Sequence, residues 1–168
     1  MGTTLVMGLF SDNRVTVAQI GDSRLYRLRG EEFAVVTHDH SLLQEQIDQG
    51  MITAAEARFS QNKNLVTRAL GVELSVESEI HEYDVLPGDI YLFCSDGLND
   101  MLPDEEIQLA LQTLSVNLEL AADQLIQMAN DNGGRDNVSV ILVKVLRAFP
   151  ECPDNGGSQE QGGGQWQS

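Results

Sequence analysis

Three aspartates stand in sequence contexts that could support metal chemistry. Asp22 lies in the motif GDSR, Asp96 in SDGL and Asp136 in GGRDN. Each comes at the end of an apolar run or just before one, beside Gly, Ser or Asn. Because small neighbours let backbone segments approach closely, carboxylates from separate strand ends can converge on one point.

Convergence of these carboxylates would require a cation. Two unit charges about 4 Å apart repel by about 4 kcal/mol at an effective dielectric constant near 20. A hard divalent ion removes that repulsion, and oxygen-only ligands without His or Cys nearby favour magnesium or manganese over zinc. Asp22, Asp96 and Asp136 are therefore the candidate metal ligands.

Other interpretations of these residues stay open at this point. Any one aspartate alone is more simply a turn residue whose side chain bonds its own backbone. Calcium is disfavoured, because an EF-hand loop starting at Asp131 would have Gly133 and Arg135 where oxygen ligands are needed. The segment His38-Asp39-His40 could resemble a metal pair, but a turn with structural roles is favoured.

The composition limits the class of protein. The 168 residues carry 10 Lys and Arg against 26 Asp and Glu, a net charge of −16, which excludes nonspecific nucleic-acid binding. The longest apolar runs are far too short to span a membrane, and no signal-like sequence opens the chain. Its two cysteines form no disulfide framework. We therefore predict a protein of the cytoplasm with no membrane partner.

Hydrophobic periodicity predicts the elements that would position the three aspartates. Four antiparallel strands in a meander are expected at 3–10, 15–20, 25–28 and 33–36. Capping boxes that begin at Ser41 and Thr53 predict two helices, the first ending near Gly50. Further strands are expected at 79–85, 90–94 and 138–146, and further helices at 103–114 and 117–130. The pattern is that of an α+β fold with mostly antiparallel strands.

One domain is expected, because the length supports one core and no internal repeat is found. It covers residues 1–148. Residues 149–168 are rich in Gly, Gln and Pro and have few apolar side chains, so they cannot bury enough surface to offset the entropy of ordering. We predict that this tail is disordered.

Taken in order, the segments GTT, GDSR, DHS, TRALG, SDGL and GGRDN resemble the metal-dependent protein phosphatase (PPM) family of the 2C type, in its compact bacterial form. The resemblance covers residues 1–146. It implies an antiparallel two-sheet β-sandwich flanked by helices, and hydrolysis of phosphoserine and phosphothreonine by a water that Mn²⁺ or Mg²⁺ activates, with no side-chain nucleophile. It also implies that Asp96 and Asp136 hold one of two catalytic ions, and that Asp22 with Asp96 forms a third, weaker site.

The resemblance carries further expectations about substrates and completeness. Residues 39–64 correspond to a mobile flap beside the active site, and the partners are phosphoprotein substrates and a cognate serine/threonine kinase. The upstream part of the family domain, with an Asp-Gly motif that bridges both ions, has no counterpart here. We therefore expect a fold incomplete at its N-terminus, impaired activity, and open sheet edges and apolar faces. The alternative is a noncatalytic regulatory or interaction module that keeps the fold remnant.

Overall fold

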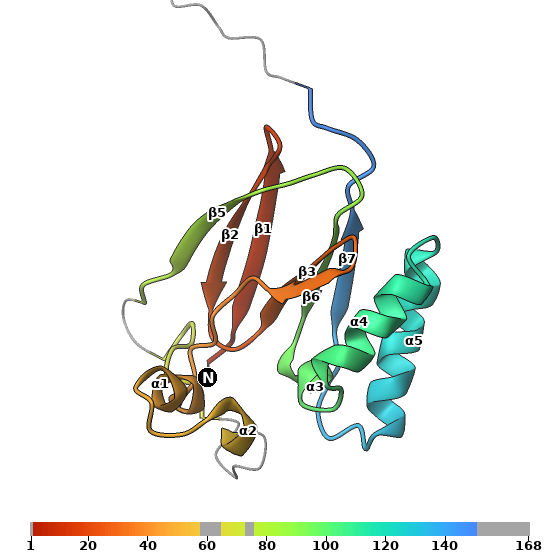
Figure 1. The fold of residues 1–168 in the computed structure, drawn as a ribbon. Coiled ribbons are helices and arrows are strands. Elements are labelled where there is room, and N and C mark those ends of the chain that lie inside the picture. Colours follow the sequence, from red (N-terminus) through yellow and green to blue (C-terminus); the bar gives the residue numbers. More distant parts are fainter. Residues whose placement is uncertain (1, 58–64, 73–75, 151–168) are drawn as a thin grey trace, which may run out of the picture.

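A computed structural model describes residues 2–57, 65–72 and 76–150 of the chain, and it has a layered α+β architecture (Figure 1). The described strands are β1 (Leu5–Ser11), β2 (Arg14–Ile20), β3 (Arg24–Arg29), β4 (Glu32–Val35), β5 (Glu79–Asp84), β6 (Ile90–Cys94) and β7 (Val140–Lys144). The described helices are α1 (Leu42–Asp48), α2 (Ala54–Ala57), α3 (Asp96–Asn99), α4 (Asp104–Thr113) and α5 (Leu118–Asp131).

The strands form two sheets, with the orders β1-β2-β5 and β4-β3-β6-β7, and every pairing is antiparallel. The expected two-sheet sandwich is confirmed, but the expected four-stranded meander is wrong. β2 pairs with β1 and β5, whereas β3 pairs with β4 and β6. The chain passes from one sheet to the other at residues 21–23, where Gly21 has a positive φ of 101° that turns the backbone.

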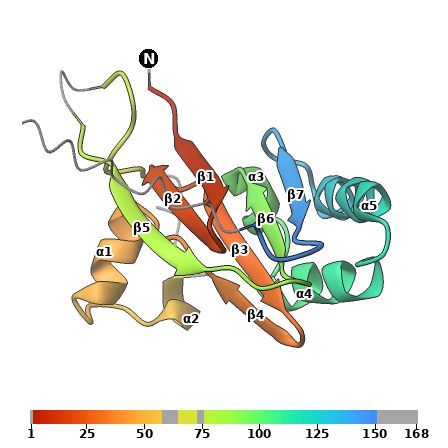
Figure 2. The ribbon, with the colours of Figure 1, turned by 90° about the horizontal axis from the view of Figure 1, so that it is seen from above.

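Two hydrophobic cores hold the layers together. One core lies between the sheets and includes Val15, Val17 and Tyr91. The other lies between the four-stranded sheet and the helices α3 to α5, and it includes Leu92 and Leu125. Viewed from above, α4 and α5 lie beside β6 and β7, and β5 lies toward the opposite side of the molecule (Figure 2). The order of layers is therefore three-stranded sheet, four-stranded sheet, helices.

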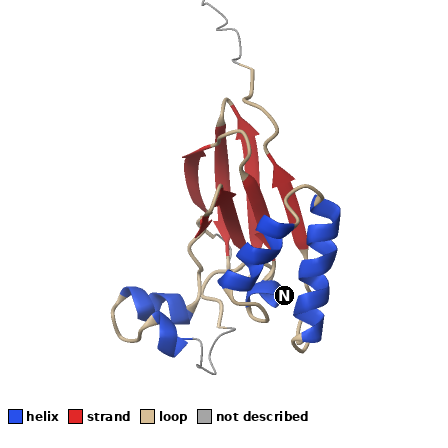
Figure 3. Cartoon of the chain, turned by 45° about the vertical axis from the view of Figure 1, so that its right-hand side comes forward, coloured by secondary structure: helices blue, strands red, loops and turns tan. Residues whose placement is uncertain are grey.

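The helix signals in the sequence correspond to local hydrogen bonds. At the start of α1, the Gln44 backbone N–H donates to Ser41 Oγ at 3.2 Å. At the start of α2, the Glu56 N–H donates to Thr53 Oγ1 at 3.2 Å, and the Thr53 N–H donates to Glu56 Oε2 at 2.8 Å. The predicted capping box at Thr53 is confirmed. At Ser41 only the N-cap bond forms, because the Gln44 side chain donates instead to Asp48 Oδ1 at 3.0 Å. Helices α1 and α2 lie apart from α4 and α5 (Figure 3).

Parts of the predicted flap and tail fall outside the described residues, namely 58–64 and 151–168. Phe149, which the sequence assigned to the tail, packs against the core between the sheets, and its N–H donates to Asn13 Oδ1 at 2.8 Å. None of the described helices combines the length and the apolar character that crossing a bilayer requires.

A buried ion pair fixes the turn that leads into β6. The carboxylate of Asp89 is only 1% exposed and accepts hydrogen bonds from Arg29 Nε at 2.8 Å and Nη2 at 2.7 Å. The Leu86 N–H donates to the same carboxylate at 2.9 Å. Burial raises the pKa of Asp89, but these hydrogen bonds outweigh it and hold the pKa below its usual value.

We predict that Asp89→Ala lowers the free energy of unfolding by about 3 kcal/mol, because it removes the carboxylate that pairs with Arg29 and that accepts from the Leu86 N–H. Denaturant unfolding at pH 7 measures this loss. Asp84→Ala is the control, since the Asp84 side chain is 84% exposed and should change stability by less than about 0.5 kcal/mol. Because the folded pKa of Asp89 is depressed, its contribution should disappear as the pH falls through that pKa, below about 3.9. Equal effects of both substitutions would contradict the prediction.

Candidate metal site

The register between β3 and β6 explains why Asp22 and Asp96 lie near each other. In this antiparallel pair Arg24 lies opposite Cys94. Asp22 is two residues before Arg24, and Asp96, the first residue of α3, is two residues after Cys94, so both lie just beyond the same end of this strand pair. The pairing therefore directs both aspartates to one end of the four-stranded sheet.

A set of short contacts holds the Asp136 loop against the start of α3. Ser95 Oγ donates to the Asn137 carbonyl at 3.0 Å and accepts from the Ser139 N–H at 3.0 Å. A Cβ on Gly97 would collide with the Asn137 carbonyl oxygen, so only glycine permits this approach. The small residues around Asp96 and Asp136 thus bring the two backbone segments together, as the sequence suggested.

The turn that carries Asp22 is fixed from both sides. The Gly21 N–H donates to His40 Nδ1 at 3.2 Å, and the His40 N–H donates to the Gly21 carbonyl at 2.9 Å. A Cβ on Gly21 would collide with the side chain of Thr4, so β1 begins directly beside this turn. Arg24 makes a bidentate ion pair with Asp39, with Nε to Oδ1 at 2.9 Å and Nη2 to Oδ2 at 2.6 Å.

Burial and neighbouring negative charges shift the pKa values of two of the three aspartates. The pKa of Asp22 is raised to about 6, first by burial and then by the negative charge of Asp96, with smaller contributions from Asp39 and Asp100. The pKa of Asp96 is also raised, first by burial and then by Asp136. The charge of Asp96 therefore acts on Asp22, and the charge of Asp136 acts on Asp96. Each predicted ligand lies within electrostatic range of at least one other.

The carboxylates of this cluster are the kind of ligand that a hard divalent ion prefers, but they supply only part of a coordination shell. Every group in the cluster is a carboxylate. Burial is the main cause of the raised pKa of Asp22, and the second cause is repulsion from Asp96, which a cation would relieve. Within residues 2–57, 65–72 and 76–150, however, no three His, Cys, Asp or Glu side chains lie close enough to hold an ion on their own. Water, substrate or other protein oxygens would have to complete the coordination. Metal binding by Asp22, Asp96 and Asp136 therefore stays a prediction.

Sequence reasoning missed two members of the acidic cluster. Asp39 lies in a predicted turn and Asp100 stands outside the three aspartate motifs, yet the charges of both raise the pKa of Asp22. The available signal for Asp100 was its spacing, because it follows Asp96 by four residues, one helical turn. Helix α3, which makes that spacing relevant, was not predicted.

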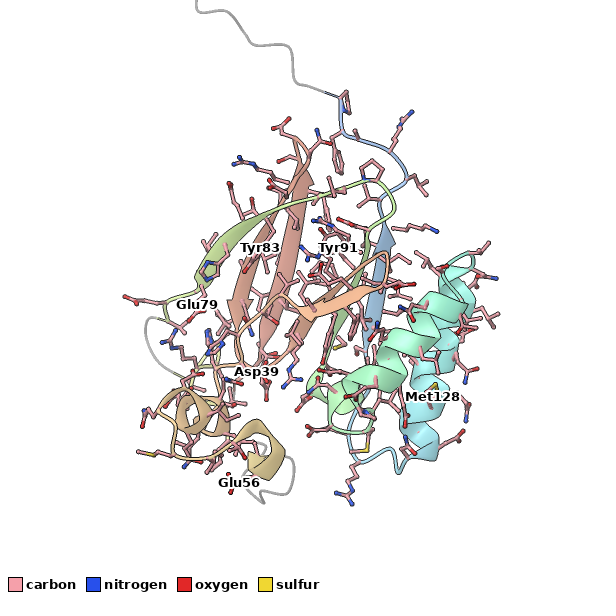
Figure 4. All side chains as sticks on the ribbon, in the orientation of Figure 1. Asp39, Glu56, Glu79, Tyr83, Tyr91 and Met128 are labelled. Atoms are coloured by element: carbon pink, nitrogen blue, oxygen red, sulfur yellow. The ribbon has the colours of Figure 1, made fainter. Side chains whose placement is uncertain are left out.

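The other polar residues near the site have structural partners, as expected. His38 Nε2 lies 2.8 Å from Asp48 Oδ2, and the buried His40 holds the Gly21 turn. The Asp39 side chain lies at the ends of the strands nearest α1 (Figure 4), where it pairs with Arg24. Arg68 Nη1 lies 3.3 Å from Glu79 Oε1. The predicted carboxylate pairing of Arg24 and Arg68 is confirmed.

Comparison with known proteins identifies the class to which this fold and site belong. The family model described as Stage II sporulation protein E (SpoIIE) matches residues 1–146. The crystal structure of the Mycobacterium tuberculosis serine/threonine phosphatase PstP/Ppp is 42% identical with a TM-score of 0.81, covering 88% of this chain and 61% of that chain. The chain belongs to the metal-dependent protein phosphatase (PPM, 2C-type) family.

Individual relatives indicate how much of a phosphatase the chain represents. The serine/threonine phosphatase Stp of Listeria innocua is 40% identical over 144 residues, which is 86% of this chain and 57% of that protein. A structure of the PstP catalytic domain in complex with two manganese ions is 42% identical with a TM-score of 0.78, covering 87% of this chain and 60% of that one. The chain thus spans little more than half the length of these proteins.

We predict that Asp22→Asn stabilises the metal-free protein at neutral pH. The folded pKa of Asp22, about 6, lies above its ordinary value of 3.8, so the wild type loses stability as the pH rises from about 4 to 6. Asn carries no charge and avoids that loss. With EDTA present, Asp22→Asn should be more stable than wild type by about 1 to 2 kcal/mol at pH 7.5, after allowance for solvent screening.

Below pH 4 both side chains are neutral, so the difference in unfolding free energy should disappear. Thermal unfolding across this pH range measures it. Asp123→Asn on the exposed face of α5 is the control and should show no such pH dependence. An Asp22→Asn protein that is less stable at every pH would contradict the electrostatic interpretation.

Proposed function

We propose that this chain is the part of a metal-dependent protein serine/threonine phosphatase that presents Asp22, Asp96 and Asp136 to Mn²⁺ or Mg²⁺. The observation that carries the proposal is the coupled carboxylate cluster at one end of the four-stranded sheet, in a chain 40% identical to Stp over 144 residues. The proposed substrates are proteins that carry phosphoserine or phosphothreonine.

In this proposal each residue has a defined role. Asp96 and Asp136 hold one of the two catalytic ions, and Asp22 with Asp96 forms a third, weaker site. When bound, such ions supply Lewis acidity toward the phosphoryl oxygens and lower the pKa of a coordinated water. The Arg24–Asp39 pair and the buried His40 act as positioning groups, because they fix the turn that carries Asp22.

We propose that this chain hydrolyses phosphoproteins more slowly than its relatives do, because it covers only part of their length. It covers 57% of Stp, and the described carboxylates form only a partial ligand set. The second candidate, a noncatalytic interaction module that binds an ion without turnover, is favoured by that same partial ligand set.

Metal titration tests the ligand assignment. We expect Mn²⁺ binding to weaken by about tenfold or more in Asp96→Asn, because carboxylate number and charge set the affinity of hard cations. Asp136→Asn should behave similarly, and Asp22→Asn should affect only a weaker event. Isothermal titration calorimetry measures the affinities, with Asp123→Asn as the matched control. Wild-type affinity in Asp96→Asn would exclude the proposed site.

A phosphatase assay separates the two candidate functions. We expect Mn²⁺-dependent release of phosphate from a phosphothreonine peptide, slow relative to full-length Stp and abolished in Asp96→Asn. If the chain binds manganese but shows no phosphate release that Asp96→Asn abolishes, the result would instead support the noncatalytic module. A cognate kinase and a cytoplasmic location remain predictions, which co-purification and cell fractionation test.

A further inference from the structure

A buried glutamine side chain spans the turn that carries Asp22. Gln19, the second-last residue of β2, is only 3% exposed. Its Nε2 donates to the Gly21 carbonyl at 3.2 Å and to the Ser23 carbonyl at 3.3 Å, which stand on either side of Asp22. Its Oε1 accepts from the His38 N–H at 3.1 Å. One side chain therefore fixes the backbone before and after the aspartate and joins it to the segment that leads into α1.

A second set of contacts supports the same turn through the buried ring of His40. Its Nδ1 accepts from the Gly21 N–H, so the proton of the neutral ring is on Nε2. His40 Nε2 lies 3.1 Å from Glu79 Oε1, and Arg68 Nη1 lies 3.3 Å from the same oxygen. The Glu79 carboxylate therefore favours the ring tautomer that leaves Nδ1 free to accept from Gly21.

The two supports meet in the three-stranded sheet. Gln19 of β2 and Glu79 of β5 are register partners, and Glu79 lies where β5 begins (Figure 4). The Thr67 N–H donates to the His40 carbonyl at 2.8 Å. The motifs GDSR, DHS and TRALG, which are far apart in the sequence, are thus joined through two side chains that belong to none of them.

The position of the turn explains why it needs these side chains. Residues 21–23 lie between β2 of one sheet and β3 of the other, beyond the ladders of both. Side chains there supply hydrogen bonds that a neighbouring strand supplies elsewhere. The segments of Asp96 and Asp136 are instead held to each other by the hydrogen bonds of Ser95. The contacts of Gln19 and Glu79 therefore bear on Asp22 more than on the other two aspartates.

We propose that Gln19 and Glu79 are positioning residues that hold Asp22 in place for the weaker metal site, which it forms with Asp96. This inference rests on the proposed function, because that function assigns Asp22 to the site. Gln19 acts through the two carbonyls beside Asp22, and Glu79 acts through His40. Substitution of groups behind a metal ligand typically lowers metal affinity by about 10- to 100-fold.

A purely structural role for these residues makes a different prediction. Loss of a buried hydrogen-bonded side chain lowers stability whatever that side chain positions. Such a loss changes the fraction of folded protein, but it leaves the ratio of the two metal affinities in the folded protein unchanged. That ratio therefore separates a positioning role from a structural one.

Calorimetric titration of the 168-residue chain with Mn²⁺ measures both affinities. Gln19→Met keeps the length of the side chain and removes its three hydrogen bonds. We expect the weaker binding event to lose about tenfold or more in affinity, while the event assigned to Asp96 and Asp136 changes by less than about twofold. Gln127→Met on the exposed face of α5 is the matched control and should change neither event.

Two substitutions of Glu79 isolate its hydrogen-bonding role from its charge. Glu79→Leu and Glu79→Gln remove the same charge, but only Gln keeps an oxygen that can accept from His40 Nε2. We expect Glu79→Leu to weaken the second event by about tenfold relative to Glu79→Gln. Circular dichroism identifies the variants that fold, and this pair decides the question if Gln19→Met does not.

The outcomes distinguish this inference from the proposed function. A weaker event that Asp22→Asn abolishes, but that folded Gln19→Met or Glu79→Leu leaves unchanged, would overturn the inference and leave the metal site standing. Equal weakening of both events would show a general structural role and would also overturn it. A wild-type chain without a weaker event that depends on Asp22 would overturn the proposed Asp22 site and the inference together.

Discussion

Repulsion among carboxylates is the constraint on which the site depends. The charge of Asp96 raises the pKa of Asp22, and the charge of Asp136 raises the pKa of Asp96, because backbone contacts hold the three segments close together. The β3–β6 register and the Ser95 hydrogen bonds hold the segments together. The fold thus holds carboxylates near one another at an electrostatic cost, and a cation bound at the proposed site would relieve that repulsion.

Much of this arrangement could be predicted from local sequence, since the signals are local. Ser41 and Thr53 cap helices through side chains a few residues away, and glycine at position 97 marks a close backbone approach. The passage of the chain from one sheet to the other between β2 and β3 could not be predicted. Strand periodicity is the same whether the next strand pairs with the last or enters another sheet, and only the tertiary partners of β3 decide it. Helix α3 has four residues, too few to show a period.

The outer faces of the two sheets have different surroundings. The four-stranded sheet carries Asp96 and the Asp136 loop at one end and is covered by helices on its outer face. The three-stranded sheet begins beside Asp22, through the contact of Thr4 with Gly21, and has an apolar outer face. The half that helices cover therefore holds Asp96 and Asp136, the ligands proposed for a catalytic ion, and the other half adjoins Asp22, the ligand proposed for the weaker site.

The crossover at residues 21–23 gives Asp22 a mechanical role that the other two aspartates do not share. Asp96 and Asp136 flank β6 and β7, which are hydrogen-bonded neighbours in one sheet, so their separation is insensitive to how the two sheets slide over each other. Asp22 follows β2 of one sheet and precedes β3 of the other. If the two sheets slid over each other, Asp22 would move relative to Asp96. The proposed site of Asp22 and Asp96 would then change its geometry more than the proposed site of Asp96 and Asp136.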